Sequence, residues 1–300
     1  MKPVFKIYLP NIKEGWNFPF VLFSIALKDL IKKIGYEIGY IKKLEELKSD
    51  EFLFFFTGHL LQDKDFLSDL LTIKNKIVLY NSESLILHKP LGPFISTNKN
   101  IILNLDFYKE NIKRLALSDT ASYYCPPVFH ETYLNNSIEF KRYNKEDYLY
   151  DILIYGSICD RRQKIIDELK HKGLSVNYTF NFETPEKLND AIANSKVILI
   201  ISFLEKHCPI DYFRLSYLLS NKALVIHEQT SLGDKEEKAE YCNKVIFCEY
   251  SNLVTKCLCI LSKTEEELNN LAYEAFKEFK SLNRLEDRFP VEKLNQCLLK

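Results

Sequence analysis

Residues Asp151 to Leu169, DILIYGSICDRRQKIIDEL, decide the fold of this chain. The segment up to Tyr155 is apolar and β-branched, as in a parallel strand that is covered on both faces. Gly156 and Ser157 then end that strand, and apolar residues recur at helical spacing from Asp160 onward. The sequence here predicts a strand, a tight turn and a helix, which is the repeating unit of an open α/β sheet.

Two arginines, Arg161 and Arg162, fall in the first turn of the predicted helix. The helix macrodipole already places partial positive charge at that end and favours acids there. A phosphate held by backbone N–H groups and an arginine fork would resolve the conflict. Alternatively, Asp160 offsets one arginine and water solvates both. The sequence leaves the two interpretations open.

The composition is that of a globular protein without a strong electrostatic field. The chain has 300 residues, 46% hydrophobic and 27% charged, which is enough for about two domains. Lys+Arg and Asp+Glu each number 41, so the formal net charge is zero and no nucleic-acid partner is expected. No apolar run approaches the roughly 20 residues of a membrane helix, and the first residues indicate a strand rather than a signal peptide. We therefore expect a cytoplasmic protein without a transmembrane segment.

Strands and helices alternate along both halves, the pattern of two doubly wound parallel sheets. In the first half, strands are predicted at 4–9, 36–41, 52–56, 76–80 and 101–105, and helices at 19–34, 63–71 and 111–115. In the second half, strands are predicted at 151–155, 175–180, 196–202, 223–227 and 244–248. Helices are predicted there at 160–172, 185–194, 211–220, 252–261, 264–282 and 290–299. The polar stretch from about 130 to 147 has no apolar period and is interpreted as the crossing between domains.

Several local sequences together carry a resemblance to a known family. Besides the opening stretch they are SKVILIISFLEKHCPIDYFRLSYLLSNKALVIHE (Ser195 to Glu228), IVLYNSESL (Ile77 to Leu85) and YYCPPVF (Tyr123 to Phe129). In this order they resemble the glycosyltransferases of the GT-B fold. The similarity is greatest to the group-1-like, CgeB-like branch, in which an arginine pair follows a strand ending in YGS and an R-x-S-Y-L-L helix follows later.

The resemblance implies a fold, a reaction and a division of labour. It implies two Rossmann-like, doubly wound domains facing a cleft: 1–147 for the acceptor and 148–300 for the nucleotide-sugar donor. The last helix, about 290–300, is expected to pack back on the N-terminal domain. The implied reaction moves a sugar to a glycan, lipid or other hydroxyl acceptor, whose identity the sequence does not give. No metal or other cofactor is expected, because arginines and helix N-termini would meet the charge of the diphosphate.

The candidate donor site consists of strand ends and helix starts in the second half. Arg214 lies one turn into the helix that begins near Asp211, where it either faces an anion or pairs with Asp211 at i, i+3. Many members of the family carry two glutamates separated by seven residues across this loop and helix. Here Asp211 is the only acid on that helix and Glu205 lies in the preceding loop, so the roles of these acids stay open. The predicted donor-binding residues are Gly156, Ser157, Arg161, Arg162, Glu205, His207, Asp211, Arg214 and Glu228.

The candidate catalytic residues are His59 and Glu83, each of which follows a predicted buried strand of the N-terminal half. An inverting transferase needs a base for the acceptor hydroxyl, whereas a retaining one need not have an obvious one. His59 has the better unperturbed pKa, and Glu83 would need burial to raise its own. His88, His130 and His171 are expected to be structural or solvated.

A second hypothesis is a non-catalytic GT-B-like module that binds a nucleotide, a glycan or a protein partner. The missing pair of glutamates supports it. A Rossmann oxidoreductase is disfavoured, because neither half has a G-x-G-x-x-G after its first strand.

Overall fold

The computed structural model describes residues 2–9, 18–60, 68–135, 138, 148–180, 184–206, 209–229, 238 and 245–299, with the backbone alone for residues 18, 19, 59, 60 and 185. These residues form two compact units. Of the described residues, unit 1 comprises 2–9, Phe20–Pro127 and the segment from Leu285 onward, and unit 2 contains Val128–Arg284 together with residues 18 and 19. Each unit is a parallel sheet with helices packed on it, so the predicted α/β class is confirmed.

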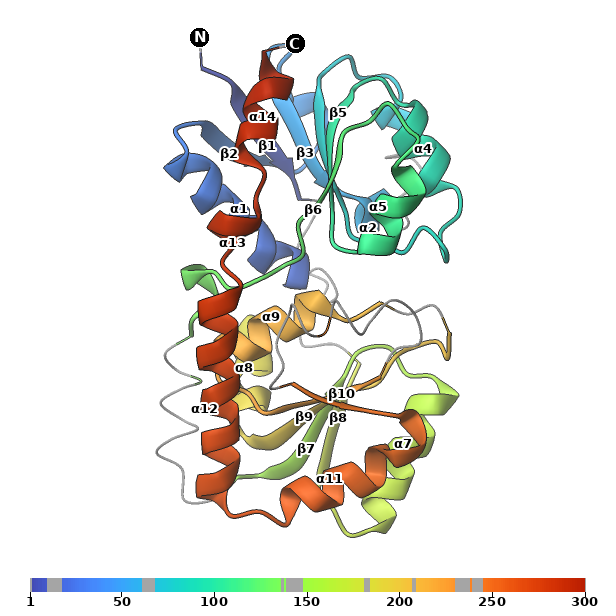
Figure 1. Cartoon of the computed structure of the whole chain (residues 1–300), viewed down its shortest axis with the longest axis vertical. Helices are drawn as coiled ribbons and strands as arrows, with labels where there is room; N and C mark the ends of the chain where they lie inside the picture. The colour runs from blue at the N-terminus through green and yellow to red at the C-terminus, as the bar shows by residue number, and fades with distance from the viewer. Residues whose placement is uncertain are drawn as a thin grey trace. The chain divides into compact units, whose positions relative to one another are not determined.

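Unit 1 contains a six-stranded parallel sheet in the order β2-β1-β3-β4-β5-β6 (Figure 1). Its strands are β1 Val4–Tyr8, β2 Glu37–Ile41, β3 Phe52–Phe56, β4 Ile77–Asn81, β5 Ile101–Asp106 and β6 Ser122–Tyr124. Its helices are α1 Phe18–Lys33, η2 Leu44–Glu46, α2 Thr57–Leu60, α4 Leu91–Thr97, α5 Lys109–Leu115, α13 Leu285–Arg288 and α14 Val291–Leu298. The apolar sequences FLFFF and IVLYN form the central strands β3 and β4, because both faces of the sheet are covered there.

The C-terminal segment belongs to unit 1. Leu294 of α14 is fully buried, and Tyr36 Oη donates to Asn295 Oδ1 at 2.6 Å. Lys33 Nζ of α1 lies 3.7 Å from Glu286 Oε1. The chain therefore leaves unit 1 at Pro127 and returns to it at Leu285.

Unit 2 contains a five-stranded parallel sheet in the order β11-β10-β9-β7-β8. Its strands are β7 Tyr150–Tyr155, β8 Val176–Thr179, β9 Ser195–Ile200, β10 Val225–Glu228 and β11 Ile246–Cys248. Its helices are η3 Glu131–Tyr133, α7 Asp160–His171, α8 Pro185–Ala193, α9 Tyr212–Ser220, η4 Tyr250–Asn252, α11 Leu253–Leu261 and α12 Glu265–Leu282. Helices α7 and α11 pack together, as do α9 and α12, on the two sides of the sheet (Figure 1).

The division between the units falls before residue 130, whereas the sequence placed it at 147. The segment after Pro127 is tied to the second sheet's helices: Phe129 N–H donates to Asn283 O at 2.8 Å, and its ring packs against Phe279. Asn221 Nδ2 donates to Tyr133 O at 2.8 Å. These contacts assign the start of the polar stretch to unit 2.

The order of the strands locates the place where a ligand would bind in each unit. In unit 2 the chain runs from β7 to β8 on one side and then returns to β9 on the other. In unit 1 the same reversal occurs at β1 and β3. In open α/β sheets ligands bind at the carboxyl ends of the strands beside such a reversal. This rule points to the carboxyl ends of β7 and β9 in unit 2 and of β1 and β3 in unit 1. Strand β10 continues the first of these edges, and β4 and β5 continue the second.

Candidate functional site

Gly156 turns the chain from the carboxyl end of β7 toward α7. Its φ of +115° lies in the left-handed region that suits glycine. A Cβ at this position would lie 3.1 Å from Arg162 Nη1 and 3.5 Å from Arg214 Nη1. Two guanidinium groups, one from α7 and one from α9, therefore flank this turn. Such a pair of like charges is stabilised by a nearby anion.

Arg162 is buried at this turn, with 3% of its surface exposed. Its Nε and Nη2 donate to Ile201 O at 2.9 and 2.6 Å, and its Nη1 donates to Ser157 O at 2.6 Å. Burial, and then the neighbouring Arg214, lower the pKa of Arg162 to about 10. Among the described residues no carboxylate lies within ion-pair distance of it. It is a buried cation held by carbonyl oxygens alone within that part of the chain.

The N-terminus of α7 adds further positive potential beside Arg162. Its N-cap residue, Cys159, makes no side-chain capping hydrogen bond. Thr184, Asp211 and Thr264 cap α8, α9 and α12 with a side-chain oxygen, whereas α4, α5, α11 and α14 lack such a cap, as α7 does. Uncapped N–H groups at a helix start attract anions, because the macrodipole adds to their partial charges.

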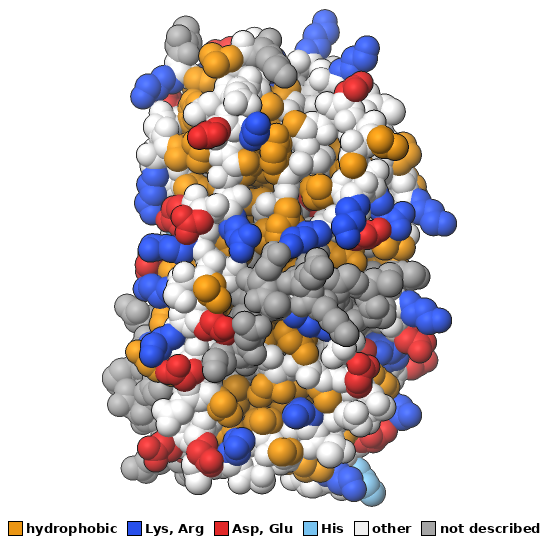
Figure 2. Space-filling model, in the orientation of Figure 1, with side chains coloured by type: hydrophobic (Ala, Val, Ile, Leu, Met, Phe, Trp, Pro, Cys, Tyr) orange, Lys and Arg blue, Asp and Glu red, His pale blue; other side chains and the backbone are white. Residues whose placement is uncertain are grey.

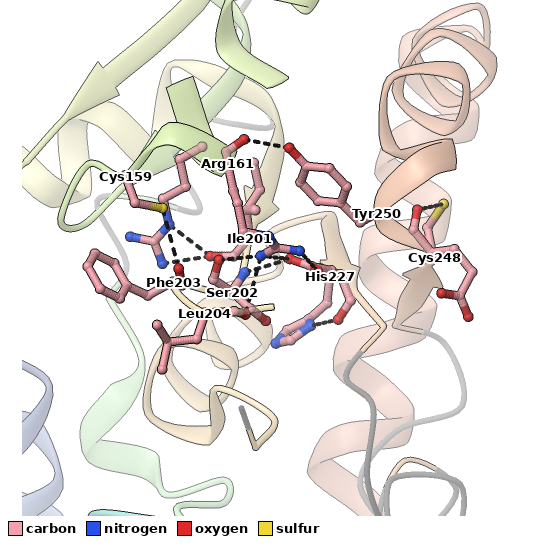
Figure 3. Close-up of polar contacts among 12 residues, drawn as sticks. Cys159, Arg161, Ile201, Ser202, Phe203, Leu204, His227, Cys248 and Tyr250 are labelled. Carbon is pink, nitrogen blue, oxygen red and sulfur yellow. Dashed lines mark hydrogen bonds and ion pairs between the residues drawn. The ribbon is translucent and has the colours of Figure 1, made fainter. Parts of the chain in front are cut away.

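Arg161, the other arginine of the pair, forms an ion pair with a buried carboxylate (Figure 3). Its Nη2 and Nη1 donate to Glu228 Oε1 and Oε2 at 2.5 and 3.3 Å, and Nη1 also donates to Ser202 O at 2.9 Å. The Ser202 N–H donates to Glu228 Oε2 at 2.8 Å, and the ring of Tyr250 lies under the guanidinium. Arg161 and Glu228 thus hold the loop that follows β9. Arg162 is buried and the Arg161 side chain is 21% exposed, so neither arginine is fully solvated as the alternative interpretation expected.

Asp211 and Arg214 form the pair that the i, i+3 alternative predicted. The Asp211 carboxylate accepts the Arg214 N–H at 3.1 Å and its Nε–H at 2.6 Å. The Arg214 guanidinium holds the pKa of Asp211 below its usual value against the effect of burial. Arg214 Nη1 also donates to Tyr155 O at 2.8 Å, next to Gly156. The pairing therefore leaves Arg214 at the turn after β7.

His227 is a buried residue that the sequence analysis did not select. It precedes Glu228 in β10, its Nε2 accepts the Asp211 N–H at 3.3 Å, and its Nδ1 lies 2.5 Å from Glu228 O. Burial lowers the pKa of His227 to about 4, so the imidazole is neutral at pH 7 with its proton on Nδ1. It joins the start of α9 to the end of β10. A histidine directly before the strand-end acid was the available signal.

Two other predicted donor residues contribute less to this geometry. Glu205 is exposed in the loop after β9, and Ser157 is exposed beside Gly156, where its carbonyl accepts from Arg162. His207 lies outside the described residues. Gly156, Ser157, Arg162 and Arg214 are therefore brought together at one turn, with Arg161, Asp211 and Glu228 bracing it.

The carboxyl edge of the unit 1 sheet carries a buried polar network instead of arginines. Thr57 Oγ1 donates to Asn81 Oδ1 at 2.8 Å and accepts the Ser82 N–H at 2.9 Å. Ser82 Oγ in turn accepts the Gly58 N–H at 3.0 Å. These bonds join the end of β3 to the end of β4. The segment that carries Glu83 is thereby fixed at its start.

Asp106, fully buried at the end of β5, organises the rest of this network. Its carboxylate accepts from Asn81 Nδ2 at 2.7 Å, Asn111 Nδ2 at 3.0 Å and the Tyr108 N–H at 3.0 Å. Burial raises the pKa of Asp106 to about 7, although these bonds favour the charged form. The two oriented asparagines then hold Glu83: its N–H donates to Asn81 Oδ1 at 3.2 Å, and its carbonyl accepts from Asn111 Nδ2 at 2.8 Å.

Glu83 is buried enough to have the raised pKa that a general base of this kind requires. Its side chain is 24% exposed, and burial raises its pKa to about 7. Its Oε1 would lie 3.1 Å from a Cβ on Gly58, so that glycine leaves room for the carboxyl group. His59 follows in α2, but its side chain is not among those described. Of the two candidate bases, only Glu83 has a side chain among the described residues.

Among the described residues no group of three or more histidines, cysteines, aspartates or glutamates could hold a metal ion. None of the described helices combines the length and the apolar character of a membrane span. Acidic and basic side chains are interspersed over the visible face (Figure 2), consistent with a formal net charge of zero.

No protein-family model matches the chain. Three uncharacterized proteins of Acanthamoeba polyphaga mimivirus match its sequence. One is 24% identical over 271 residues, 87% of this chain and 83% of that protein. A second is 24% identical over 199 residues, 66% and 65% of the two chains. The match to the third spans 28% of that longer protein.

Solved structures match over the whole chain. Sucrose-phosphate synthase from Thermosynechococcus elongatus aligns with a TM-score of 0.63 and 9% identity over 100% of this chain and 99% of that one. This chain has the GT-B fold. HepE from Anabaena, solved in complex with UDP-glucose, aligns with a TM-score of 0.55 and 11% identity, and WaaG, a glycosyltransferase involved in lipopolysaccharide biosynthesis, with 0.55 and 10%. Each of these two alignments covers 99% of this chain and 98% of the other. The predicted GT-B fold is thereby confirmed, and its two sheets are those of the glycosyltransferases that share it.

Proposed function

We propose that the protein is a glycosyltransferase that moves a sugar from a nucleotide-sugar donor to a hydroxyl acceptor. The observation that carries the proposal is buried Arg162 at the Gly156 turn, beside the uncapped start of α7. This turn lies at the carboxyl end of β7, where the order of the strands reverses. In the GT-B fold, an anion-attracting turn at this place suits the diphosphate of a nucleotide sugar.

The donor diphosphate is assigned to the N–H groups at the start of α7 and to the guanidinium groups of Arg162 and Arg214. Both guanidiniums already lie at Gly156, so no reorganisation is needed as charge develops on the departing diphosphate. Arg161 and Glu228 support this site by holding the loop after β9. HepE was solved with UDP-glucose, which supports a nucleotide-sugar donor of that class. Membership of the CgeB-like branch and a cytoplasmic location remain parts of the proposal.

The acceptor hydroxyl is assigned to unit 1, with Glu83 as its general base. A carboxylate with a pKa of about 7 accepts a proton far better than an ordinary glutamate does, and it is still ionised in a large fraction of molecules at pH 7. The network of Asp106, Asn81 and Asn111 holds the backbone of Glu83 on both sides. His59 stays a candidate from the sequence for the same role. The proposed acceptor is a glycan, lipid or other hydroxyl compound.

We propose that catalysis needs no divalent metal, because arginine side chains and the N-terminus of α7 surround the position assigned to the diphosphate. A DxD tripeptide, Asp63-Lys64-Asp65, lies outside the described residues. A chelator experiment covers it: release of nucleoside diphosphate should persist in excess EDTA. Loss in EDTA with recovery on adding manganese or magnesium would contradict metal independence.

The experiment that tests the function is a donor panel. The protein is incubated with UDP-, GDP-, TDP- and ADP-sugars, with and without simple glycosides as acceptors, and released nucleoside diphosphate is measured. We expect release from one donor class, with Arg162→Met slower than Lys164→Met, an exposed neighbour on the same helix. Binding of a donor without release or transfer would favour the second hypothesis, a non-catalytic binding module. Absence of both binding and release with every donor would contradict the proposal.

A further inference from the structure

A second ionisable side chain contacts the carboxyl group of Glu83. His88 Nε2 lies 3.4 Å from Glu83 Oε2. The side chain of His88 is 37% exposed, against 24% for Glu83. The imidazole is therefore more open to solvent than the carboxyl group that it contacts.

A tight turn fixes the spacing between the two side chains. The N–H groups of Leu87 and His88 both donate to Ser84 O, at 3.1 and 2.8 Å. The buried Leu85 anchors the turn, and its N–H donates to Asn111 Oδ1 at 2.9 Å. Because Asn111 also holds Glu83 O, one buried amide positions both the glutamate and the turn that leads to the histidine.

The surroundings shift the proton affinities of the two groups in opposite directions. Burial raises the pKa of Glu83 to about 7, and burial lowers the pKa of His88 from its usual value. Gly58 of α2 approaches the Glu83 carboxyl: a Cβ there would lie 3.1 Å from Glu83 Oε1 and 2.9 Å from Phe20 Cζ of α1. The side chain of His59, next to Gly58, is not described. A carboxyl group and an imidazole in contact titrate as a pair, so each of them affects the titration midpoint of the other.

We propose that His88 is a proton-relay residue, which takes from Glu83 the proton of the acceptor hydroxyl and releases it to solvent. The inference rests on the proposed role of Glu83 as the base. In the transfer step the acceptor O–H bond breaks and its proton goes to the Glu83 carboxylate. The oxygen's electron pair forms the bond to the anomeric carbon while the bond from that carbon to the diphosphate breaks.

The relay then restores the base for the next turnover. The carboxylic acid of Glu83 gives its proton to Nε2 of neutral His88, and the imidazolium gives a proton to water. One proton per sugar transferred leaves the protein, and both side chains return to their starting forms. A relay is useful here because the carboxyl group is mostly covered, whereas the imidazole is open to water.

Chemical rescue tests the relay. Turnover of His88→Ala is compared with that of Lys89→Ala, an exposed neighbour, in dilute buffer at pH 7 and with added imidazole. We expect His88→Ala to lose about tenfold to a hundredfold in turnover, imidazole to restore most of the loss, and donor affinity to stay unchanged. Glu83→Gln should gain nothing from imidazole. Turnover of His88→Ala within twofold of the parent, or a loss that imidazole does not restore, would overturn the relay.

A measurement without turnover separates the relay from the proposed function. The carboxyl carbon of Glu83 is followed by NMR during a pH titration of the substrate-free protein and its variants. His88→Ala should move the Glu83 midpoint by about half a pH unit or more, and Lys89→Ala should not. If no donor is turned over, the function fails, and an unmoved midpoint would still overturn the proton-sharing pair by itself.

Discussion

The carboxyl edges of the two sheets have opposite chemistry. In unit 2, arginines from α7 and α9 converge on Gly156, and carbonyls or acids hold them in place. In unit 1, the corresponding edge has buried acids, asparagines and hydroxyls, and burial raises the pKa of both Glu83 and Asp106 to about 7. In the proposed function, the same parallel architecture supplies a place for an anion in one unit and a place for proton transfer in the other.

A shared topology sets where a site lies, and the polar residues at the strand ends set what the site does. Both edges fix a loop through buried polar contacts between strands. Unit 2 uses the Arg161–Glu228 pair for this, and unit 1 uses Asp106 with its two asparagines. Substitutions at each edge should therefore affect different steps of the reaction.

The largest effect is expected from Glu83→Gln in unit 1. Because the amide cannot accept the proton, turnover should fall by about 10² to 10⁴ while donor affinity stays within twofold. Glu45→Gln, at an exposed glutamate of the same unit, is the control. Steady-state rates and calorimetric titration of the donor measure the two quantities. A Glu83→Gln variant with turnover within a few-fold of the parent would place the base elsewhere, with His59 the next residue to test.

Arg161→Met should lower the free energy of unfolding by about 3 kcal/mol, because it leaves the buried Glu228 without its cationic partner. This value is at the low end of the range for breaking a buried ion pair, since a fifth of the Arg161 side chain is exposed. Urea denaturation of this variant, of Glu228→Gln and of the double variant would give the coupling between the two side chains. Additive losses in that cycle would show that the pair does not brace the loop.

Arg162→Met should weaken binding of a nucleoside diphosphate by about tenfold to a hundredfold, the value of a charge-assisted hydrogen bond. Binding of the corresponding nucleoside should hardly change, because it lacks the phosphates. Lys164→Met on the exposed face of α7 should leave both affinities alone. Calorimetry with the two ligands checks this. Equal losses for nucleoside and diphosphate would indicate collapse of the loop after β9 and would contradict a local charge effect.

The smallest expected effect is the change in folding stability with pH, and the sign of this change differs between the two units. Asp106 has a folded pKa of about 7, above its ordinary value, so it keeps its proton in the folded state and contributes stability that is lost as pH rises from about 4 to 7. His227 has a folded pKa of about 4, below its ordinary value, so its contribution is lost as pH falls from about 6.5 to 4. Urea denaturation at pH 5, 6 and 7 measures both.

Relative to the parent, Asp106→Asn should therefore gain stability with rising pH, and His227→Gln should lose stability with rising pH. Parallel pH profiles in both variants would contradict the opposed protonation of the two edges.

The alternation of apolar strands and helices predicted the five strands of the unit 2 sheet and five of the six strands of the unit 1 sheet, and it missed the short edge strand β6. The predicted strand ends at Gly156 and at Asn81-Ser82-Glu83 lie where the structure has polar residues at a sheet edge. Helix α4 was missed because Gly92 and Pro93 suggest a loop, although a proline in the first turn of a helix removes no needed donor. The predicted helix at 63–71 falls largely outside the described residues.

The site was less predictable because its contacts join distant parts of the chain. Arg161 and Arg162 look equivalent in sequence, yet only one of them meets Glu228, which lies 67 positions away. The role of Asp106 depends on asparagines in two other elements, and single asparagines carry little signal in a sequence. His227 was overlooked because its contact with the Asp211 N–H becomes visible only when the start of α9 is placed beside β10.

A crystal structure of the protein with a bound nucleoside diphosphate tests the central claim most directly. We predict that the diphosphate contacts the N–H groups at the start of α7 and the guanidinium groups of Arg162 and Arg214. Arg161 should still be paired to Glu228. A diphosphate bound in unit 1 against Glu83 and Asp106, or one in unit 2 that contacts neither Arg162 nor the start of α7, would contradict it.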